Sequence, residues 1–177
     1  MRTFPKAGSL FALGFLVFAL AALPARSLAQ GAPNPPPDAA LRITGRVGRP
    51  LVLHDDDLMK LPRQTLKVSD EKGVPALYEG VAVAELLRRA GVPLGKDLRG
   101  PRLKLYVVVE ALDGYRAVFA LPEFDPAFTD RVILLADRRD GHALSASEGP
   151  FRIVVPGEKR HARWVREVSA LDVEQAQ

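Results

Sequence analysis

Alternation of apolar and polar residues dominates the chain from residue 41 to residue 173 and predicts short β-strands. In residues 41–47 apolar side chains recur at every second position, which is the pattern of a strand with one buried face. Glycine, proline and Asp-Gly turn signals separate the later runs. These runs predict strands at residues 51–53, 64–69, 103–110, 115–120, 132–136, 151–155 and 164–173. Three consecutive valines at 107–109 favour a central strand buried on both faces.

One segment has helical periodicity instead. Val83, Leu86, Leu87 and Ala90 recur at i, i+3, i+4 and i+7, which predicts an amphipathic helix over residues 82–90. Gly91 suits the left-handed position that follows a last helical turn.

Two shorter helical turns complete the expected elements. One is expected to be capped by an aspartate of residues 55–57 and to end at Leu61, and the other opens at Pro122 and runs towards Phe128. Strands outnumber helices and no regular β-α-β alternation occurs. The pattern therefore predicts a mostly β, α+β fold with one main amphipathic helix, and it argues against a doubly wound nucleotide-binding fold.

The first 29 residues have the pattern of an export signal. Arg2 and Lys6 precede an apolar run of 14 residues, 10–23, and the small residues Ser27 and Ala29 suit a signal-peptidase site. Spanning a bilayer takes about 20 residues, so we predict cleavage after Ala29 rather than a membrane anchor. The sequence thus predicts a periplasmic or secreted protein with no membrane span after cleavage.

Cleavage changes the charge balance and leaves one domain. Loss of three basic residues lowers the formal net charge from +4 to +1, and no basic stripe with interleaved aromatics remains, so nucleic acid is not an expected partner. Residues 30–40 are proline-rich and are predicted to be a linker. Residues 41–174 have the length of one domain. The chain contains no cysteine, which excludes disulfides and thiolate metal ligands.

Three ordered segments of this domain resemble the oxidoreductase molybdopterin-binding domain family, of which sulfite oxidase is the best-known member. Residues 78–92 are similar to its aromatic-x-Gly-Val helix motif, and residues 110–115, 134–137 and 141–144 to a strand, turn and Leu-Leu-Ala run. Residues 149–157 and 163–165 are similar to its Gly-x-Pro-Leu-Arg-Leu-Val-Val-Pro-Gly stretch and the tryptophan that follows. The resemblance implies a sulfite-oxidase-type fold that holds molybdopterin in a cleft.

One departure from the family separates its fold from its chemistry. In catalytic members a cysteine upstream of the Gly-Val helix binds molybdenum through its thiolate. The corresponding residues here, 64–69, contain no cysteine. Ser69 has a hydroxyl, which ionises far less readily than a thiol of pKa about 8.5, so it is not nominated as a ligand. Sulfite-oxidase chemistry is not expected.

The resemblance directs attention to the segment that follows Pro156-Gly157. Lys159, Arg160, His161 and Arg163 lie beside Trp164 in a predicted loop, where cations bind phosphate groups and an indole offers a stacking face. In the family the corresponding loop lies near the pterin phosphate. The same residues also suit a solvated hairpin tip with the tryptophan in the core.

Other candidate residues have more ordinary explanations. Asp113 and Tyr115 belong to a predicted Asp-Gly hairpin turn, which the resemblance places near the cleft. Acidic residues 55–57, next to His54, suit the first turn of a helix better than a metal site, because adjacent helical residues diverge by about 100°. We therefore predict no metal ligands. Serines 145 and 147 lack a nucleophile-elbow motif, which argues against a hydrolase.

Two functions remain open from the sequence, and a third, oxidoreductase activity with molybdenum held only by its dithiolene, ranks after both because nothing replaces the thiolate. The first is a periplasmic protein that resembles sulfite-oxidase-type oxidoreductases and binds a pterin or another small anionic ligand in the ancestral cleft. The alternative is a non-catalytic periplasmic module that kept only the fold and binds a partner protein or a ligand.

Overall fold

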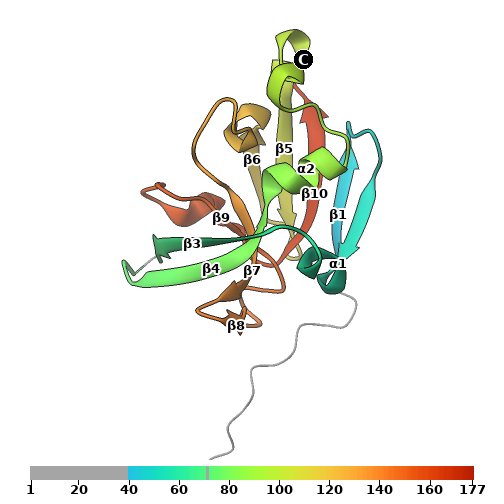
Figure 1. The fold of residues 1–177 in the computed structure, drawn as a ribbon. Helices are drawn as coiled ribbons and strands as arrows, with labels where there is room; N and C mark the ends of the chain where they lie inside the picture. The colour runs from blue at the N-terminus through green and yellow to red at the C-terminus, as the bar shows by residue number, and fades with distance from the viewer. Residues whose placement is uncertain (1–39, 71) are drawn as a thin grey trace, which may run out of the picture. The chain divides into compact units, whose positions relative to one another are not determined.

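The first and last strands of the domain pair with each other in parallel, so hydrogen bonds hold the two ends of the folded part of the chain together (Figure 1). The computed structural model describes residues 40–70 and 72–177. The predicted signal peptide, residues 1–29, and the predicted linker, residues 30–40, lie outside the described residues, except that Ala40 begins the first strand. In the described part of the chain, no helix has the length and apolarity needed to cross a membrane.

Two sheets contain the ten strands of the described residues. The first has the strand order β2-β1-β10-β5-β6 and the second β3-β4-β7-β8, with β9 paired to β7. The first comprises β1 (Ala40–Gly45), β2 (Leu51–His54), β5 (Leu105–Ala111), β6 (Arg116–Ala120) and β10 (Val168–Gln175). The second comprises β3 (Arg63–Ser69), β4 (Pro75–Ala82), β7 (Leu134–Arg139), β8 (His142–Ala143) and β9 (Arg152–Val154).

Helix α2 (Val83–Arg89) is the main helix, as its periodicity predicts. Val83, Leu86, Leu87 and Ala90 are fully buried, and Gly91 has the expected positive φ of 77°. The other helical elements are α1 (Asp55–Met59) and the 3-10 helices η1 (Gly95–Asp97), η2 (Gly100–Lys104), η3 (Leu121–Phe124) and η4 (His161–Arg163). Buried side chains of α2 and of both sheets form one hydrophobic core.

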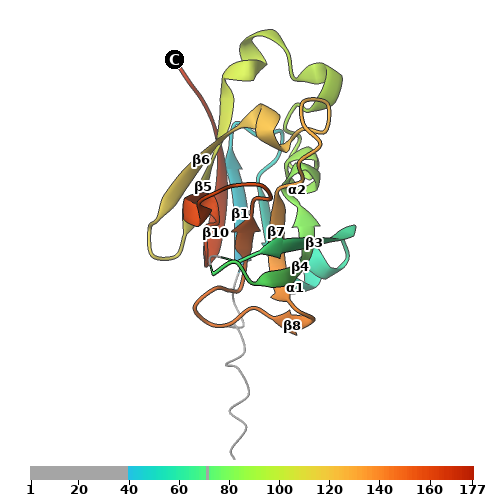
Figure 2. The same cartoon turned by 90° about the vertical axis from the view of Figure 1, so that its left-hand side faces the viewer.

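The mostly β, α+β prediction is confirmed, but β5 differs from its predicted environment. β5 is hydrogen-bonded on both edges, to β10 and β6. Only one of its faces is fully buried, since Tyr106, Val108 and Glu110 are partly exposed while their neighbours are buried. Figure 2 shows α2 on the opposite side of the molecule from β5 and β6. A run of valines identifies a strand, but it does not say whether another layer covers the second face.

Several predicted ends also shift. The residue that caps α1 is His54, whose N–H is bonded to the Asp57 carboxylate at 3.2 Å, and not an aspartate. Strand β1 ends at Gly45, where a Cβ would lie 2.2 Å from the Val173 carbonyl oxygen. Strand β10 begins at Val168 and not at residue 164, because the preceding residues form η4 and its connection. Trp164 therefore precedes the strand.

Candidate functional site

The connection between β9 and β10 carries η4 and separates two clefts. The first cleft has a volume of about 880 Å³ and the second about 530 Å³. His161, Ala162 and Trp164 border both. The sequence-predicted loop is thus a ridge between two hollows.

The first cleft brings the basic part of this loop against the turn between β3 and β4. Its lining includes Val68, Ser69 and Asp70 on one side, and Lys159 and Arg160 on the other. Figure 1 shows the η4 loop and the β3–β4 hairpin extending on the same side of the molecule. The residues that the resemblance aligns with the metal-binding segment therefore lie opposite the predicted anion-binding loop.

The second cleft contains the two hairpin candidates. Asp113 and Tyr115 line it together with Arg166 and Glu167. The Asp113 carboxylate accepts the Tyr115 N–H at 2.9 Å, and the Tyr115 hydroxyl donates to the Ala162 carbonyl oxygen at 2.8 Å. This last bond joins the β5–β6 hairpin to η4, so Tyr115 has a structural role whether or not a ligand occupies the cleft.

Trp164 lies in the core and not on a stacking surface. It is only 4% exposed, and its indole N–H donates to the Val155 carbonyl oxygen at 2.9 Å. The His161 ring stacks on the indole with 3.8 Å between centroids and 14° between planes. Tyr78 meets the indole edge-on at 5.9 Å. The partly buried His161 ring therefore covers the indole where the two clefts meet.

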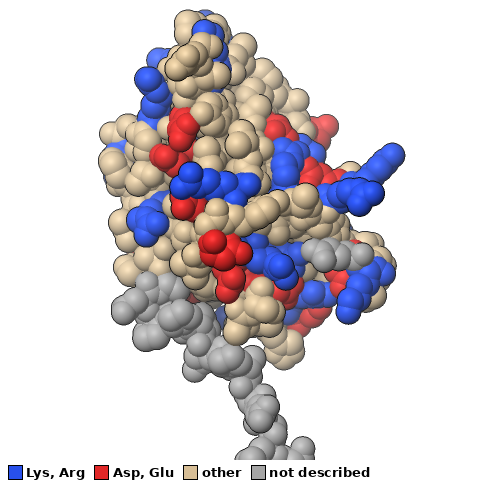
Figure 3. Space-filling model, turned by 180° about the vertical axis from the view of Figure 1, so that it is seen from behind, with Lys and Arg blue, Asp and Glu red and all other residues tan. Residues whose placement is uncertain are grey.

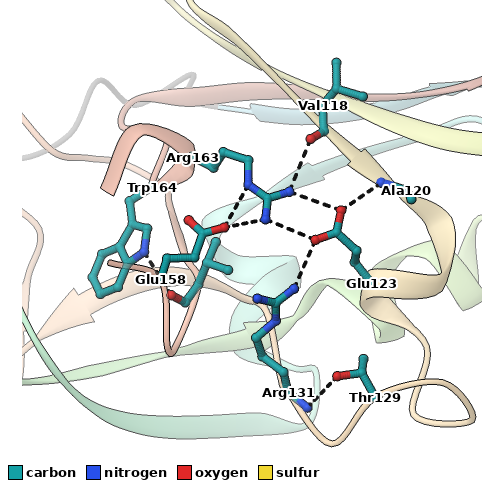
Figure 4. Close-up of polar contacts among 9 residues, drawn as sticks. Val118, Ala120, Glu123, Thr129, Arg131, Glu158, Arg163 and Trp164 are labelled. Carbon is teal, nitrogen blue, oxygen red and sulfur yellow. Dashed lines mark hydrogen bonds and ion pairs between the residues drawn. The ribbon is translucent and has the colours of Figure 1, made fainter. Parts of the chain in front are cut away.

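Arg163 lines neither cleft and is engaged in ion pairs. Its guanidinium contacts Glu158 and donates to both carboxylate oxygens of Glu123 at 3.1 Å (Figure 4). The guanidinium also lies 4.4 Å from the centroid of the Phe119 ring. Arg131 is bonded to the same Glu123 carboxylate at 3.0 Å. This cluster fixes η4 to η3.

The cluster lowers the pKa of Glu123 below its ordinary value. Burial alone would raise it, but the hydrogen bonds from Arg163 and from the Ala120 N–H outweigh burial. The pKa of Arg163 is raised because its hydrogen bonds to the carboxylates of Glu123 and Glu158 outweigh the effect of its burial. Both groups stay charged at neutral pH, so the contact is a fixed structural ion pair.

The two acidic residues that line the first cleft are each paired with an arginine that does not line it. Asp70 pairs with Arg139 at 2.8 Å, and Glu158 pairs with Arg163. Lys159 and Arg160 are exposed and form no ion pair with any described residue. On the face shown in Figure 3, basic and acidic side chains are intermixed. Lys159 and Arg160 therefore lack carboxylate partners because the two acidic lining residues are paired with other arginines, and not because basic residues are in excess.

Asp70 lines the first cleft but was not among the site residues predicted from the sequence. Its carboxylate accepts the N–H groups of Lys72 and Val74, both at 2.9 Å. The bond from Val74 and the pairing with Arg139 lower the pKa of Asp70. The Asp70-Glu71-Lys72-Gly73 turn signal is visible in the sequence. The pairing of Asp70 with Arg139, 69 residues later in the chain, is not visible in the sequence.

The donors of the first cleft do not fit a molybdenum atom bound through a protein thiolate. The chain has no sulfur ligand of that kind, and the carboxylates of Asp70 and Glu158 are occupied by arginines. The Ser69 hydroxyl is a poor substitute. Nowhere in residues 40–70 and 72–177 do three His, Asp or Glu side chains gather as metal ligands would. The basic loop, in contrast, suits a phosphate group.

Comparison with known proteins agrees with this architecture. The family described as "Oxidoreductase molybdopterin binding domain" matches residues 30–177. The sulfane dehydrogenase SoxCD of Paracoccus pantotrophus is similar in structure, with a TM-score of 0.61 and 25% sequence identity over 77% of this chain. The match covers 38% of the SoxCD chain. Among curated proteins, no match was found. The protein therefore belongs to the oxidoreductase molybdopterin-binding domain family, with a fold of the sulfite-oxidase type.

Proposed function

We propose that this protein binds an anionic ligand in the first cleft and performs no chemistry that needs a molybdenum–thiolate bond. The single observation that carries the proposal is the pair Lys159 and Arg160, which face the cleft without a carboxylate partner among the described residues. Cations of this kind bind phosphate-bearing ligands through charge-assisted hydrogen bonds. A cleft of about 880 Å³ also lies within the size range of small-molecule and cofactor sites.

Molybdopterin is the candidate ligand that the family suggests. Its terminal phosphate suits Lys159 and Arg160, whereas the region of Ser69 offers no thiolate for the metal. We propose that any bound pterin is held through its anionic end, and that the missing sulfur leaves the metal without a protein anchor. The redox activity of catalytic relatives is therefore not part of the proposal.

The ligand proposal is tested with the mature protein and two probes. Isothermal titration with inorganic pyrophosphate should show binding that weakens about tenfold or more in Lys159→Ala/Arg160→Ala, equivalent to about 1.4 kcal/mol. The matched control is Lys96→Ala/Arg99→Ala, which removes the same charge at exposed positions outside both clefts. Equal weakening by the two double variants would attribute binding to net charge alone and contradict the proposal.

Protein from the native host addresses the pterin itself. Extraction and fluorescence detection should recover pterin without stoichiometric molybdenum. Stoichiometric molybdenum would contradict the inferred loss of metal anchoring, and absence of pterin would leave a different anion as the ligand that the pyrophosphate titration measures.

We further propose that the protein acts outside the cytoplasm. The proposal is supported by the pattern of residues 1–29, in which basic residues are followed by an apolar run and then by small residues. Amino-terminal sequencing of protein from a periplasmic fraction should begin at Gln30. A mature protein that still carries residue 1 would contradict cleavage.

A further inference from the structure

Strand β3 leaves one edge of the second sheet open. Its seven residues pair with β4, and β3 is the terminal strand of that sheet. No hydrogen bond among the described residues joins the outer edge of β3 to another segment. An open edge of this kind offers main-chain donors and acceptors to a further strand.

The pairing with β4 shows which main-chain groups face outward. The Asp70 N–H donates to the Val74 carbonyl oxygen at 2.8 Å, while the next pair joins Ser69 to Pro75, which has no N–H. Bonded and non-bonded pairs alternate in an antiparallel ladder. The main-chain groups of Ser69, Lys67 and Thr65 therefore point to the open edge.

The other sheet edges offer less. Strands β2 and β8 have four and two residues. On β6, the Val118 carbonyl oxygen already accepts a bond from Arg163. Natural proteins usually shorten or block their edges, and along β3 the single charged interior residue is Lys67. The longest unprotected edge of the described residues is thus β3.

The end of this open edge borders the first cleft. Val68 and Ser69, at the end of β3, and Asp70, which follows it, form one wall, and the loop with Lys159 and Arg160 forms the other. Lys67 is exposed on the same strand and also has no ion pair among the described residues. Lys67 does not line the cleft, which therefore combines the end of a strand-pairing edge with two cations, Lys159 and Arg160, that have no carboxylate partner among the described residues.

We infer that the outer edge of β3 receives an extended acidic peptide segment of a partner protein, which adds to the second sheet as a further strand against Lys159 and Arg160. The inference rests on the proposed anion-binding cleft and assigns to its two cations a second class of anion, the carboxylates of a peptide, beside the phosphate group of a small ligand. Main-chain hydrogen bonds to Ser69, Lys67 and Thr65 would form with any extended peptide, whatever its sequence. The carboxylates of the peptide would make the binding selective, because they pair with the two cations. Because side chains alternate along a strand, the segment carries acidic residues at every second position.

The test uses a fluorescein-labelled seven-residue peptide that alternates valine and glutamate, with fluorescence anisotropy as the readout. Two further versions carry N-methyl groups, one on every valine amide and one on every glutamate amide. Only one set of amides can face β3, so one methylated version should bind about tenfold more weakly and the other nearly as well as the parent. A valine–lysine peptide should not bind.

Protein variants test the other side of the contact. Ser69→Pro removes an outward N–H and should weaken peptide binding about tenfold, whereas Ser69→Ala keeps the N–H and should not. Circular dichroism checks the folding of both. If Ser69→Pro does not fold, the two methylated peptides decide with the wild-type protein.

The outcomes separate this inference from the proposed function. Equal binding of both methylated peptides would show simple charge attraction and overturn strand addition. Binding of pyrophosphate without binding of the acidic peptide would overturn the peptide inference and leave the anion site standing. Failure of both probes would overturn the proposed function as well.

Discussion

Replacement of Gly80 by alanine tests the packing of the second sheet. Gly80 belongs to the aromatic-x-Gly-Val motif and lies in β4 opposite Ala136 of β7, beside a register shift. Its φ is not positive, so it needs space and not an unusual backbone conformation. A Cβ at this position would lie 2.0 Å from the Leu135 carbonyl oxygen and 2.7 Å from the Ala136 Cα.

These distances set the magnitude of the effect. Ordinary contacts between carbon atoms are about 3.5–4.0 Å, so β4 must move away from β7 by about 1 Å or more. That movement breaks about two ladder hydrogen bonds, at about 1 kcal/mol each, and adds about 1–3 kcal/mol for overpacking. Gly80→Ala should therefore lower the free energy of unfolding by about 3–5 kcal/mol, a large part of the stability of a typical domain.

Urea denaturation followed by the fluorescence of Trp164, the single tryptophan, measures this loss. The control is Gly141→Ala, where φ is 80° but nothing lies within 4 Å of the new Cβ, so only backbone strain of about 1–2 kcal/mol is expected. If Gly80→Ala costs no more than Gly141→Ala, the close approach of β4 and β7 is wrong.

Three further changes test the core and the ion-pair cluster. Leu86→Ala on the fully buried face of α2 should cost about 2–5 kcal/mol, and a shift of only a degree or two in thermal melting would contradict that burial. Tyr78→Phe removes a buried hydroxyl that has no hydrogen-bond partner in the described structure, so unfolding in urea should show equal or greater stability, and a loss above about 1 kcal/mol would indicate an additional partner. Glu123→Gln should cost about 1–2 kcal/mol at pH 7. Because the pKa of Glu123 is lowered by folding, its stabilisation is complete above about pH 4.3 and is lost as the pH falls through the lower folded value. Stability measured from pH 6 to pH 2 should thus fall less steeply in Glu123→Gln than in the wild type, and parallel curves would refute the pKa assignment.

Local sequence patterns predicted which helices and strands form better than they predicted how those helices and strands are buried. The spacing of Val83, Leu86 and Leu87 identified α2 because a helix places these side chains on one face wherever it lies. Strand β5 was found for a similar reason, but its second face was assigned to the core by mistake. Burial of that face depends on whether another layer covers the sheet, and alternation within one strand does not contain this information.

The same distinction holds for the candidate site, whose residues could be grouped from the sequence although their surroundings could not be predicted from it. The sequence placed Lys159, Arg160, His161, Arg163 and Trp164 in one basic loop, since they are neighbours in the chain. The structure gives them different surroundings: Arg163 pairs with Glu123, 40 residues away, and Trp164 is buried under His161. A pattern of residue types could not separate the engaged arginine from the exposed one.

The sequence by itself determined the mostly β fold with one main helix, the family, and the absence of a thiolate, because periodicity, motif order and composition are properties of the chain. Tertiary structure alone decided which charges remain available to a ligand. Asp70 and Glu158 would cancel Lys159 and Arg160 if they were only counted, but folding commits them to Arg139 and Arg163. Folding also brings the open edge of β3 to the same cleft as these cations. The reason is that ion pairs and sheet edges are formed between segments far apart in the chain, and their partners are chosen by the packing of the two sheets.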